Sequence, residues 1–307
     1  MKIGFIGTGV MGGGMARNLI TKGEELLIVA RRAEVREVLA SLGASVSDRM
    51  ADAAACPCVF LCLPDIAAVE NVVLDSDGLL AHMAPGGMIV DYSTTSYDAA
   101  RALAAQCARR GVDFLDAPIS GHRERAADGT LTIMCGGPEA AFNRVKPLLD
   151  KLGTTVLYMG GSGSGQLTKT INNCALNICT ASFCELMPLG VKLGLAPEKL
   201  GQVLMTASGA STASKTLIPE ILEGRFDHGF TLGRAYKDME NLLALTTGMA
   251  LPLPTFLGTL QTYQLALQGG QGARYKGAMI RFYEELLGVV CRAPGAEKAQ
   301  QEEKLSC

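Results

Sequence analysis

The chain has 307 residues, 48% of them hydrophobic, and its charges nearly balance, with 28 Lys and Arg against 30 Asp and Glu. This length and composition allow a large buried core and favour two domains. The charge balance gives no general attraction for nucleic acid or for an anionic membrane, and we expect no bilayer-spanning apolar run. The expected partners are therefore small molecules, not nucleic acid or a membrane.

The ten cysteines do not by themselves indicate disulfides. The chain starts directly with a strand-like sequence and lacks the basic region, apolar region and cleavage site of a signal peptide, which favours a reducing, cytoplasmic location. The closely spaced Cys56, Cys58 and Cys62 suggest a metal cluster, but no second Cys or His cluster accompanies them. We interpret this segment as a buried strand entering a loop and expect no metal site.

Short apolar runs alternate with helical patterns in the first half of the chain. The expected strands are residues 3–6, 26–30, 58–63, 88–91, 113–116 and 131–135. Between them lie segments with Ala, Leu and Arg at helical spacing, such as 13–22, 34–42 and 97–110. This alternation predicts an α/β fold with a doubly wound, parallel, Rossmann-type sheet covered by helices.

After the glycine-rich stretch 160–165, strand-like runs nearly vanish. Residues 166–193 contain no early helix breaker and predict one helix of about 28 residues, roughly 40 Å long, that joins the two domains. Pro188 predicts a kink in this helix near Cys184. The expected order is a cofactor-binding Rossmann domain (1–163), an interdomain helix (164–193), an all-helical domain for substrate binding and oligomerisation (194–290) and a disordered tail (291–307).

A glycine pattern joins the first expected strand to the first expected helix. The sequence Gly7-Thr8-Gly9-Val10-Met11-Gly12 has the spacing of loops that bind dinucleotides. In such loops the first glycine permits a tight turn, the second lets the backbone approach a pyrophosphate, and the third lets the helix pack closely on the strand. The helix N-terminus then faces the phosphate charge. The alternative is a flexible turn, but the position between strand and helix favours nucleotide binding.

The end of the second expected strand bears on which nicotinamide cofactor binds. Binding of NAD uses an acidic residue about 20 residues beyond the glycines, and none stands there. The strand ends instead at Arg31 and Arg32, and a guanidinium can pair with the 2′-phosphate of NADP through two hydrogen bonds. The alternative is that both arginines are only solvated. We predict NADP, with NAD as the second choice.

Five further motifs follow the glycine loop along the chain. They are Leu63-Pro64, Asp91-Tyr92-Ser93-Thr94, Asp116-Ala117-Pro118-Ile119-Ser120-Gly121, Gly165-Gln166-Leu167-Thr168-Lys169-Thr170-Ile171-Asn172-Asn173 and Lys237-Asp238. Together with the glycine loop, they resemble the β-hydroxyacid dehydrogenase family, which includes 3-hydroxyisobutyrate dehydrogenase, tartronate semialdehyde reductase and glyoxylate/succinic semialdehyde reductases. The resemblance covers nearly the whole chain, to about Gly288.

The resemblance implies which residues contact the cofactor. Leu63, Pro64 and Thr94 would line the nicotinamide side of the cofactor groove. Lys237 would close over the nicotinamide from the helical domain.

The resemblance also implies that Lys169 is the catalytic residue and that Ser120 and Gly121 hold the substrate carboxylate. Lys169 and Asn173 are four residues apart and so project from one face of the long helix. An ammonium can donate a proton to the oxygen of a carbonyl that accepts hydride, and the neutral amine can take the proton back in the oxidative direction. The amide of Asn173 would orient the substrate or the lysine.

Two segments depart from the family pattern. Family members commonly follow Ser-Gly with another glycine and small residues, whereas this chain continues with His122-Arg123-Glu124-Arg125. His122 and Arg123 can recognise a second anionic group on the substrate; the alternative, which we favour, is a solvated charged loop. Near the C-terminus, Arg274-Tyr275-Lys276 stands where relatives often carry an acidic residue.

Two other functions occur on this scaffold. Imine reductases and non-catalytic, cofactor-sensing relatives generally lack the catalytic lysine, so the presence of Lys169 and Asn173 argues against both. We therefore predict an NADP-preferring oxidoreductase that acts on a small, carboxylate-bearing β-hydroxy acid or aldehyde acid. The apolar, helical second half predicts a homodimer or homotetramer.

Overall fold

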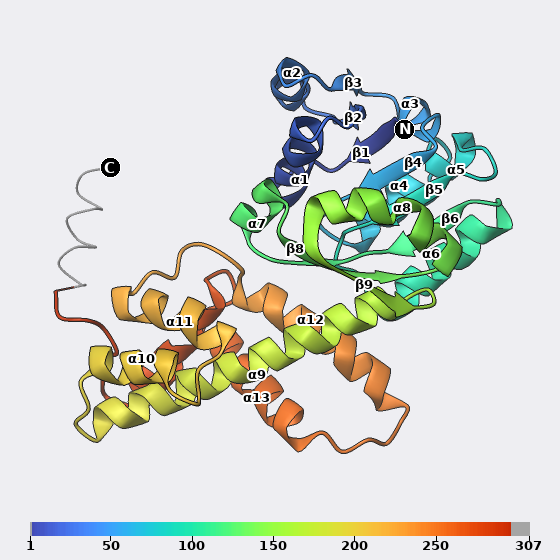
Figure 1. Cartoon of the computed structure of the whole chain (residues 1–307). Coiled ribbons are helices and arrows are strands. Elements are labelled where there is room, and N and C mark those ends of the chain that lie inside the picture. Colours follow the sequence, from blue (N-terminus) through green and yellow to red (C-terminus); the bar gives the residue numbers. More distant parts are fainter. Residues whose placement is uncertain (1, 296–307) are drawn as a thin grey trace. The chain divides into compact units, whose positions relative to one another are not determined.

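The structure is a computed structural model of the chain, and it describes residues 2–295. The chain forms two compact units, Met1–Lys169 and Thr170–Cys307, and Figure 1 shows their elements. The boundary falls inside the long helix. Most of the tail predicted to be disordered lies outside the described residues. Its first residues are packed, since Cys291 is buried and the backbone N–H of Ala293 donates to the carbonyl of Leu222 at 2.8 Å.

The first unit is built on a sheet that has nine strands within residues 2–295, in the order β3-β2-β1-β4-β5-β6-β8-β7, with β9 beside β8. All neighbours from β3 to β6 are parallel, whereas β8 is antiparallel to β6 and β7 and parallel to β9. The strands are β1 (Ile3–Ile6), β2 (Leu26–Val29), β3 (Ser45–Ser47), β4 (Cys58–Leu61), β5 (Met88–Asp91), β6 (Asp113–Asp116), β7 (Ile119–Ser120), β8 (Leu131–Gly136) and β9 (Gly153–Gly160).

The predicted fold class is confirmed, although the sequence analysis missed three strands. Strands β3 and β7 have only three and two residues, too few to show an alternating pattern. Strand β9 is different, because its run Thr154-Thr155-Val156-Leu157-Tyr158 is rich in residues that favour strands. That run was a usable signal.

Helices cover both faces of the sheet (Figure 1). Those of the first unit are α1 (Val10–Thr21), α2 (Ala33–Ser41), α3 (Met50–Ala54), α4 (Ile66–Leu74), α5 (Leu79–His82), α6 (Tyr97–Arg109), α7 (Arg123–Asp128) and α8 (Glu139–Leu152). Local capping fixes where several of them begin. The side chain of Asp65 accepts the Ala68 N–H at the start of α4, and Ser96 accepts the Ala99 N–H at the start of α6.

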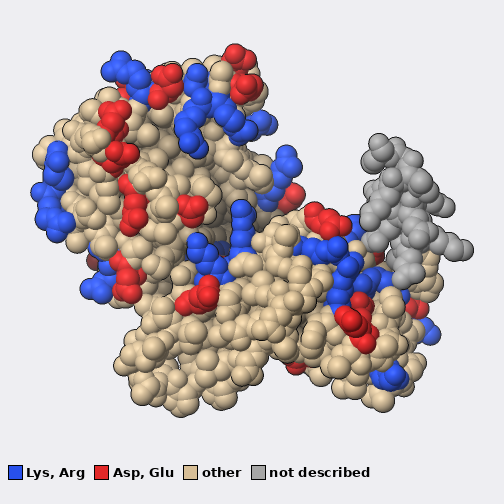
Figure 2. Space-filling model, turned by 180° about the vertical axis from the view of Figure 1, so that it is seen from behind, with Lys and Arg blue, Asp and Glu red and all other residues tan. Residues whose placement is uncertain are grey.

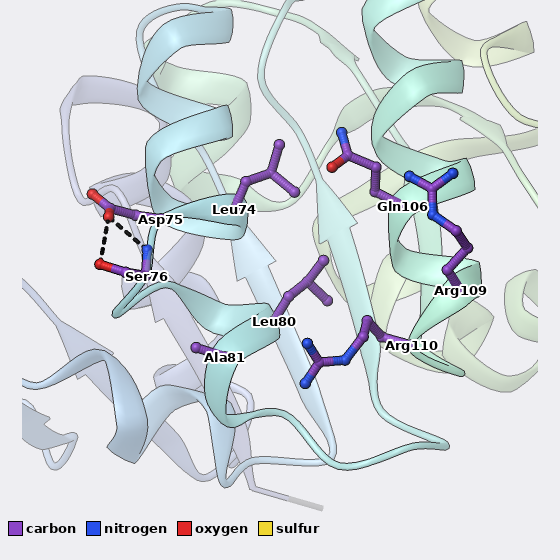
Figure 3. Close-up of a pocket in the computed structure, with 8 residues that line it drawn as sticks. All are labelled: Leu74, Asp75, Ser76, Leu80, Ala81, Gln106, Arg109 and Arg110. Carbon is purple, nitrogen blue, oxygen red and sulfur yellow. Dashed lines mark hydrogen bonds between the residues drawn. The ribbon is translucent and has the colours of Figure 1, made fainter.

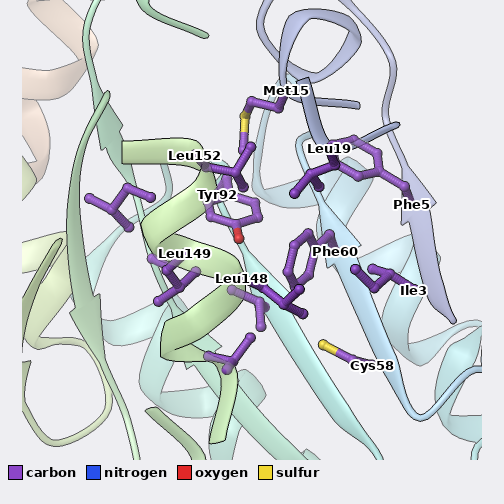
Figure 4. Packing of buried hydrophobic residues seen from close by; sticks show 14 of the residues in the cluster. Ile3, Phe5, Met15, Leu19, Cys58, Phe60, Tyr92, Leu148, Leu149 and Leu152 are labelled. Carbon is purple, nitrogen blue, oxygen red and sulfur yellow. The ribbon is translucent and has the colours of Figure 1, made fainter. Parts of the chain in front are cut away.

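The central strands β1, β2, β4 and β5 are buried on both faces, so their residues alternate between two cores. Phe5 and Phe60 belong to the core under α1 and α8, whereas the next residues along the strands, Ile6 and Leu61, belong to the core under α3 to α6. Phe60 packs edge-on against Tyr92, with ring centroids 5.2 Å apart (Figure 4). A sheet with two apolar faces needs helices on both sides, which explains the near-continuous apolar runs in the sequence.

The second unit is helical throughout its described residues, apart from one isolated bridge between Thr231 and Tyr275. Its core contains the fully buried Ile218, Met239 and Tyr263. Its helices are α10 (Pro197–Thr206), α11 (Thr212–Glu223), α12 (Leu232–Thr247), α13 (Pro254–Gln268), the 3₁₀ helix η1 (Lys276–Met279) and α14 (Ile280–Leu287).

Helix α9 (Ser164–Lys192) has 29 residues and carries the chain from the first unit into the second. Pro188 lies inside it, and the helix continues beyond the proline to Lys192. By length and composition alone α9 is apolar enough to cross a membrane, so the expectation that no run reaches this length was wrong. This is weak evidence for a membrane span, because the core helices of soluble proteins meet the same criterion, and 44% of its most apolar window is buried in the protein.

Candidate functional site

The glycine loop after β1 has the geometry that close backbone approach requires. Gly7 has a φ of +95°, and a Cβ added there would lie 2.3 Å from the carbonyl oxygen of Cys62. A Cβ on Gly12 would lie 2.0 Å from the carbonyl oxygen of Gly7. No atom lies within 4 Å of the position that a Cβ on Gly9 would take. The fold itself therefore requires Gly7 and Gly12, whereas Gly9 leaves space for a close-approaching group.

Helix α1 begins at this space. Gly9 is its N-cap, no side chain caps it, and the Gly13 N–H donates to the Gly9 carbonyl at 2.7 Å. The first N–H groups of a helix lack partners within the helix and carry partial positive charge. The first turn contains no acidic residue, and Val10 is 68% exposed. Thr8, Val10 and Met11 thus present backbone suited to a phosphate group.

Three arginines lie in the turn after β2 or early in the helix α2 that follows it. Arg31 and Arg32 are exposed, and Arg32 is the N-cap of α2. Arg36, which the sequence analysis did not single out, donates to the carbonyl of Ala30 at 2.6 Å and to that of Arg31 at 3.1 Å. Arg36 therefore fixes the turn from which Arg31 and Arg32 project.

Hydrogen bonds tie together the loops that follow β4 and β5. The Leu63 N–H donates to the Ser93 hydroxyl at 2.8 Å, and the Ser93 N–H donates to the carboxylate of Asp91 at 2.9 Å. Leu63 is half-buried, whereas Pro64 and Thr94 are exposed. The residues expected on the nicotinamide side thus lie on two loops that a buried serine connects.

Two carboxyl groups are buried at the ends of neighbouring strands. Asp91 on β5 is in register with Asp116 on β6, and both are removed from water. Burial, together with the nearby charge of Asp116, raises the pKa of Asp91 to about 7, although the hydrogen bonds from Ser93 lower it. Burial also raises the pKa of Asp116, while backbone N–H groups, chiefly those of Gly163 and Gln166, lower it.

The predicted carboxylate-binding residues lie at the end of β7. Strand β7 is held by β8, with Ser120 opposite Thr132. Gly121 has a φ of +147°, and a Cβ there would lie 2.8 Å from the Leu131 side chain. A larger residue at Gly121 would be strained and would clash, so the backbone here keeps a conformation that favours glycine.

The charged segment that follows forms the start of the short helix α7. His122 is its N-cap, and His122, Arg123 and Glu124 are exposed. Arg125 differs, because its Nε donates to the carbonyl of Thr130 at 2.8 Å. Arg125 thus closes its own loop, whereas His122 and Arg123 face solvent.

The predicted catalytic residues lie on α9, where Lys169 ends the first compact unit and Asn173 belongs to the second. Lys169 is half-buried. The amide nitrogen of Asn173 donates to the carboxylate of Asp238 on α12 at 2.7 Å, while the neighbouring Lys237 is exposed. Asp238, which the sequence analysis quoted only as part of a motif, therefore holds Asn173.

One turn further along α9 lies a polar contact that the sequence analysis missed. The Lys276 ammonium, only 6% exposed, donates to the side-chain oxygen of Asn177 at 3.2 Å. The Asn177 amide nitrogen donates to the carbonyl of Ala235 at 3.3 Å. The spacing of four residues from Lys169 to Asn173 and again to Asn177 was a signal that could have found it.

A surface pocket in the first unit lies away from these residues. Asp75 and Ser76, which follow α4, Leu80 on α5, and Arg109 and Arg110 at the end of α6 line it (Figure 3). These helices end just before β5 and β6 begin, so the pocket lies at the opposite edge of the sheet from the glycine loop. Within residues 2–295 no group of three or more His, Cys, Asp or Glu side chains could hold a metal ion.

Two family models match most of the chain. A family model described as the NAD-binding domain of 6-phosphogluconate dehydrogenase matches residues 2–160. A second, described as NAD-binding of NADP-dependent 3-hydroxyisobutyrate dehydrogenase, matches residues 163–283.

Individual relatives align with this chain over almost their full lengths. 2-(Hydroxymethyl)glutarate dehydrogenase of Eubacterium barkeri is 35% identical over 94% of this chain and 97% of its own. 2-Hydroxy-3-oxopropionate reductase of Escherichia coli is 33% identical over 92% of this chain and 97% of its own. The crystal structure of 3-hydroxyisobutyrate dehydrogenase from Salmonella typhimurium matches with a TM-score of 0.82 at 26% identity. The match covers 92% of this chain and 99% of that structure's chain.

Substitution of Gly9 separates binding from folding. Because the position of a Cβ is open in the structure, Gly9→Ala should keep the melting temperature of the wild type. If the pyrophosphate binds in this space, as the glycine spacing predicts, a methyl group there should weaken NADPH binding, measured by fluorescence titration, by at least about tenfold. Gly12→Ala is the comparison, since its Cβ would clash with Gly7 and lower the melting temperature. Unchanged NADPH affinity in Gly9→Ala would contradict this role.

Asp91 should make stability depend on pH. Its pKa rises from 3.8 to about 7 on folding, so between these values the folded protein holds a proton that the unfolded chain releases. The raised pKa of Asp91 therefore stabilises the folded protein to its full extent below about pH 4. This stabilisation is lost as the pH rises towards 7. Urea unfolding at about pH 5 and pH 8 should show that Asp91→Asn removes this loss. Asp48→Asn, at an exposed carboxylate, should keep the loss of stability between the two pH values. An equal change in the free energy of unfolding from about pH 5 to pH 8 in both variants would refute the assignment.

Proposed function

Because this chain belongs to the β-hydroxyacid dehydrogenase family of NAD(P)-dependent oxidoreductases, we propose that Lys169 is its general acid and base. The observation that carries the proposal is the position of Lys169, early in α9 and in the same compact unit as the glycine loop. We further propose NADP as the preferred cofactor and a small β-hydroxy acid or aldehyde acid as substrate.

The open space at Gly9 and the uncapped start of α1 fit the pyrophosphate of a dinucleotide. When bound, the nicotinamide supplies or accepts the hydride. As the substrate carbonyl is reduced, its oxygen gains negative charge. The Lys169 ammonium stabilises this charge and donates a proton to the oxygen. In the oxidative direction the neutral Lys169 amine accepts the proton of the hydroxyl group. Asn173, held by Asp238, orients the substrate.

The substrate carboxylate is assigned to Ser120 and Gly121, where the left-handed backbone of Gly121 supports a tight, exposed loop. The exposed His122 and Arg123 are the candidates for contact with a second anionic group. The relative named for 2-(hydroxymethyl)glutarate, a dicarboxylic acid, favours testing such substrates. The loops carrying Leu63, Pro64 and Thr94 are assigned to the nicotinamide.

We also propose that the protein is a cytoplasmic homodimer or homotetramer. Residues 241–273 contain no charged side chain, and Met249, Leu251 and Leu257 among them are exposed. Figure 2 shows an area of the second unit with hardly any charged side chains, while acidic and basic groups are interspersed over the first. An exposed apolar area of this kind indicates an interface, where contact with another subunit would bury it.

Removal of the Lys169 amine tests the mechanism. Lys169→Ala should lower kcat by at least about 100-fold, because general acid and base catalysis is lost, and should leave NADPH affinity intact. Turnover is measured with 3-hydroxyisobutyrate, tartronate semialdehyde, succinic semialdehyde, glyoxylate and 2-(hydroxymethyl)glutarate. Lys192→Ala, at the far end of the same helix, is the matched control and should behave as wild type. Retained turnover in Lys169→Ala would reject the mechanism.

The arginines after β2 should set cofactor preference. Wild-type kcat/KM should be at least about tenfold higher with NADPH than with NADH, because charge-assisted hydrogen bonds to the 2′-phosphate are lost with NADH. Arg31→Ala and Arg32→Ala, singly and together, should remove this preference by weakening NADPH use alone. Arg109→Ala, at the opposite edge of the sheet, should retain it. Equal values for both cofactors in the wild type would disprove the preference.

A further inference from the structure

The start of α9 is capped by a carboxylate from the sheet. One carboxylate oxygen of Asp116 accepts the Gly163 N–H at 2.7 Å, and the other accepts the Gln166 N–H at 2.9 Å. The carboxylate thus serves the first turn of α9 as a side-chain N-cap does, although it lies 47 residues away from Gly163 along the chain. Its negative charge is also favourable at a helix N-terminus. The start of α9 is therefore tied to the end of β6.

The side chain of Gln166 ties the same turn to the loop after β5. Its amide nitrogen donates to the carbonyl of Ser93 at 2.7 Å, and its oxygen accepts the Thr95 N–H at 3.0 Å. Gln166 is fully buried, and these two bonds fix both ends of its carboxamide. The two backbone groups flank Thr94, the residue assigned to the nicotinamide side.

Close packing leaves no space for a side chain between the start of α9 and the sheet. A Cβ on Gly165 would lie 2.4 Å from the carbonyl oxygens of both Asp116 and Met134, and a Cβ on Gly136 would lie 2.8 Å from the Gly165 nitrogen. The helix thus rests directly on the backbone of β6 and β8. With Asp116 and Gln166, this contact defines one position for the first turn.

We propose that Asp116 and Gln166 are positioning residues, which set Lys169 at a fixed place relative to the loop that carries Thr94. Lys169 follows Gln166 by three residues on α9, so its backbone moves with that turn. The inference rests on the proposed function, because it assigns these buried groups to the placement of a proton donor. A misplacement of about 1 Å can cost a reaction about 100-fold in rate.

The test replaces the carboxamide and keeps its shape. Gln166→Met leaves the Thr95 N–H and the Ser93 carbonyl without this partner, and Gln166→Glu in its protonated form can still accept from the first and donate to the second. Thr168→Val is the matched control on the same turn, because the Thr168 hydroxyl donates only to the Ser164 carbonyl of its own helix, at 2.7 Å. All variants are compared as full chains well below their melting temperatures.

We expect Gln166→Met to lower kcat by about 10- to 100-fold with NADPH affinity unchanged, and Thr168→Val to match the wild type. Gln166→Glu should recover kcat, relative to the wild type, as the pH falls and its carboxyl group takes up a proton. Should Gln166→Met fail to fold, this pH profile still decides. A purely structural role would lower the melting temperature but leave kcat and its pH profile unchanged.

Two negative results are distinguishable. The first is turnover by the wild type with an unchanged kcat in Gln166→Met, or with a ratio of Gln166→Glu kcat to wild-type kcat that does not change with pH. This result overturns the positioning role alone. Absence of turnover by the wild type with every substrate and both cofactors overturns the proposed function, and the positioning role with it.

Discussion

The burial of two carboxyl groups side by side constrains the whole carboxyl edge of the sheet. Asp91 and Asp116 end neighbouring parallel strands and have lost their water, so donors from the protein must replace it. Ser93 supplies them to Asp91, and Gly163 and Gln166 supply them to Asp116. Each donor belongs to a segment that carries assigned functional residues. The cost of an unpaired buried acceptor thus fixes where the loop after β5 and the start of α9 can lie.

Glycine makes this arrangement sterically possible at two separate places. Gly12 lets α1 lie against the loop after β1, and Gly165 lets α9 lie against β6 and β8. In both cases a helix approaches backbone atoms more closely than any side chain would allow. The difference is that α1 keeps its first N–H groups available at the open space beside Gly9, whereas the start of α9 is closed by Asp116. One N-terminus is suited to bind a ligand, and the other is used to hold a helix.

Local patterns in the sequence predicted the parts of the fold that depend on neighbouring residues. The alternation of apolar runs gave the doubly wound sheet, and the glycine spacing gave the turn at Gly7 and the close packing at Gly12. The short strand β7 and the role of Gln166 could not be obtained in this way. Asp116 and Gln166 meet across 50 residues of chain, and no spacing rule connects a strand end with a distant helix start. Arg36 was missed for the opposite reason, since an arginine on an exposed helix is unremarkable until its carbonyl partners are known.

The residues that the sequence analysis singled out as departures from the family pattern differ in what they contact. Lys276 donates to Asn177 and is almost fully buried, so it belongs to the internal packing around the third polar position of α9. Arg125 likewise binds the carbonyl of its own loop. His122 and Arg123 face solvent beside the left-handed turn at Gly121, and a charge there costs little before a ligand arrives. We therefore propose Arg123, and not the buried Lys276, as the partner for a second anionic group of a substrate.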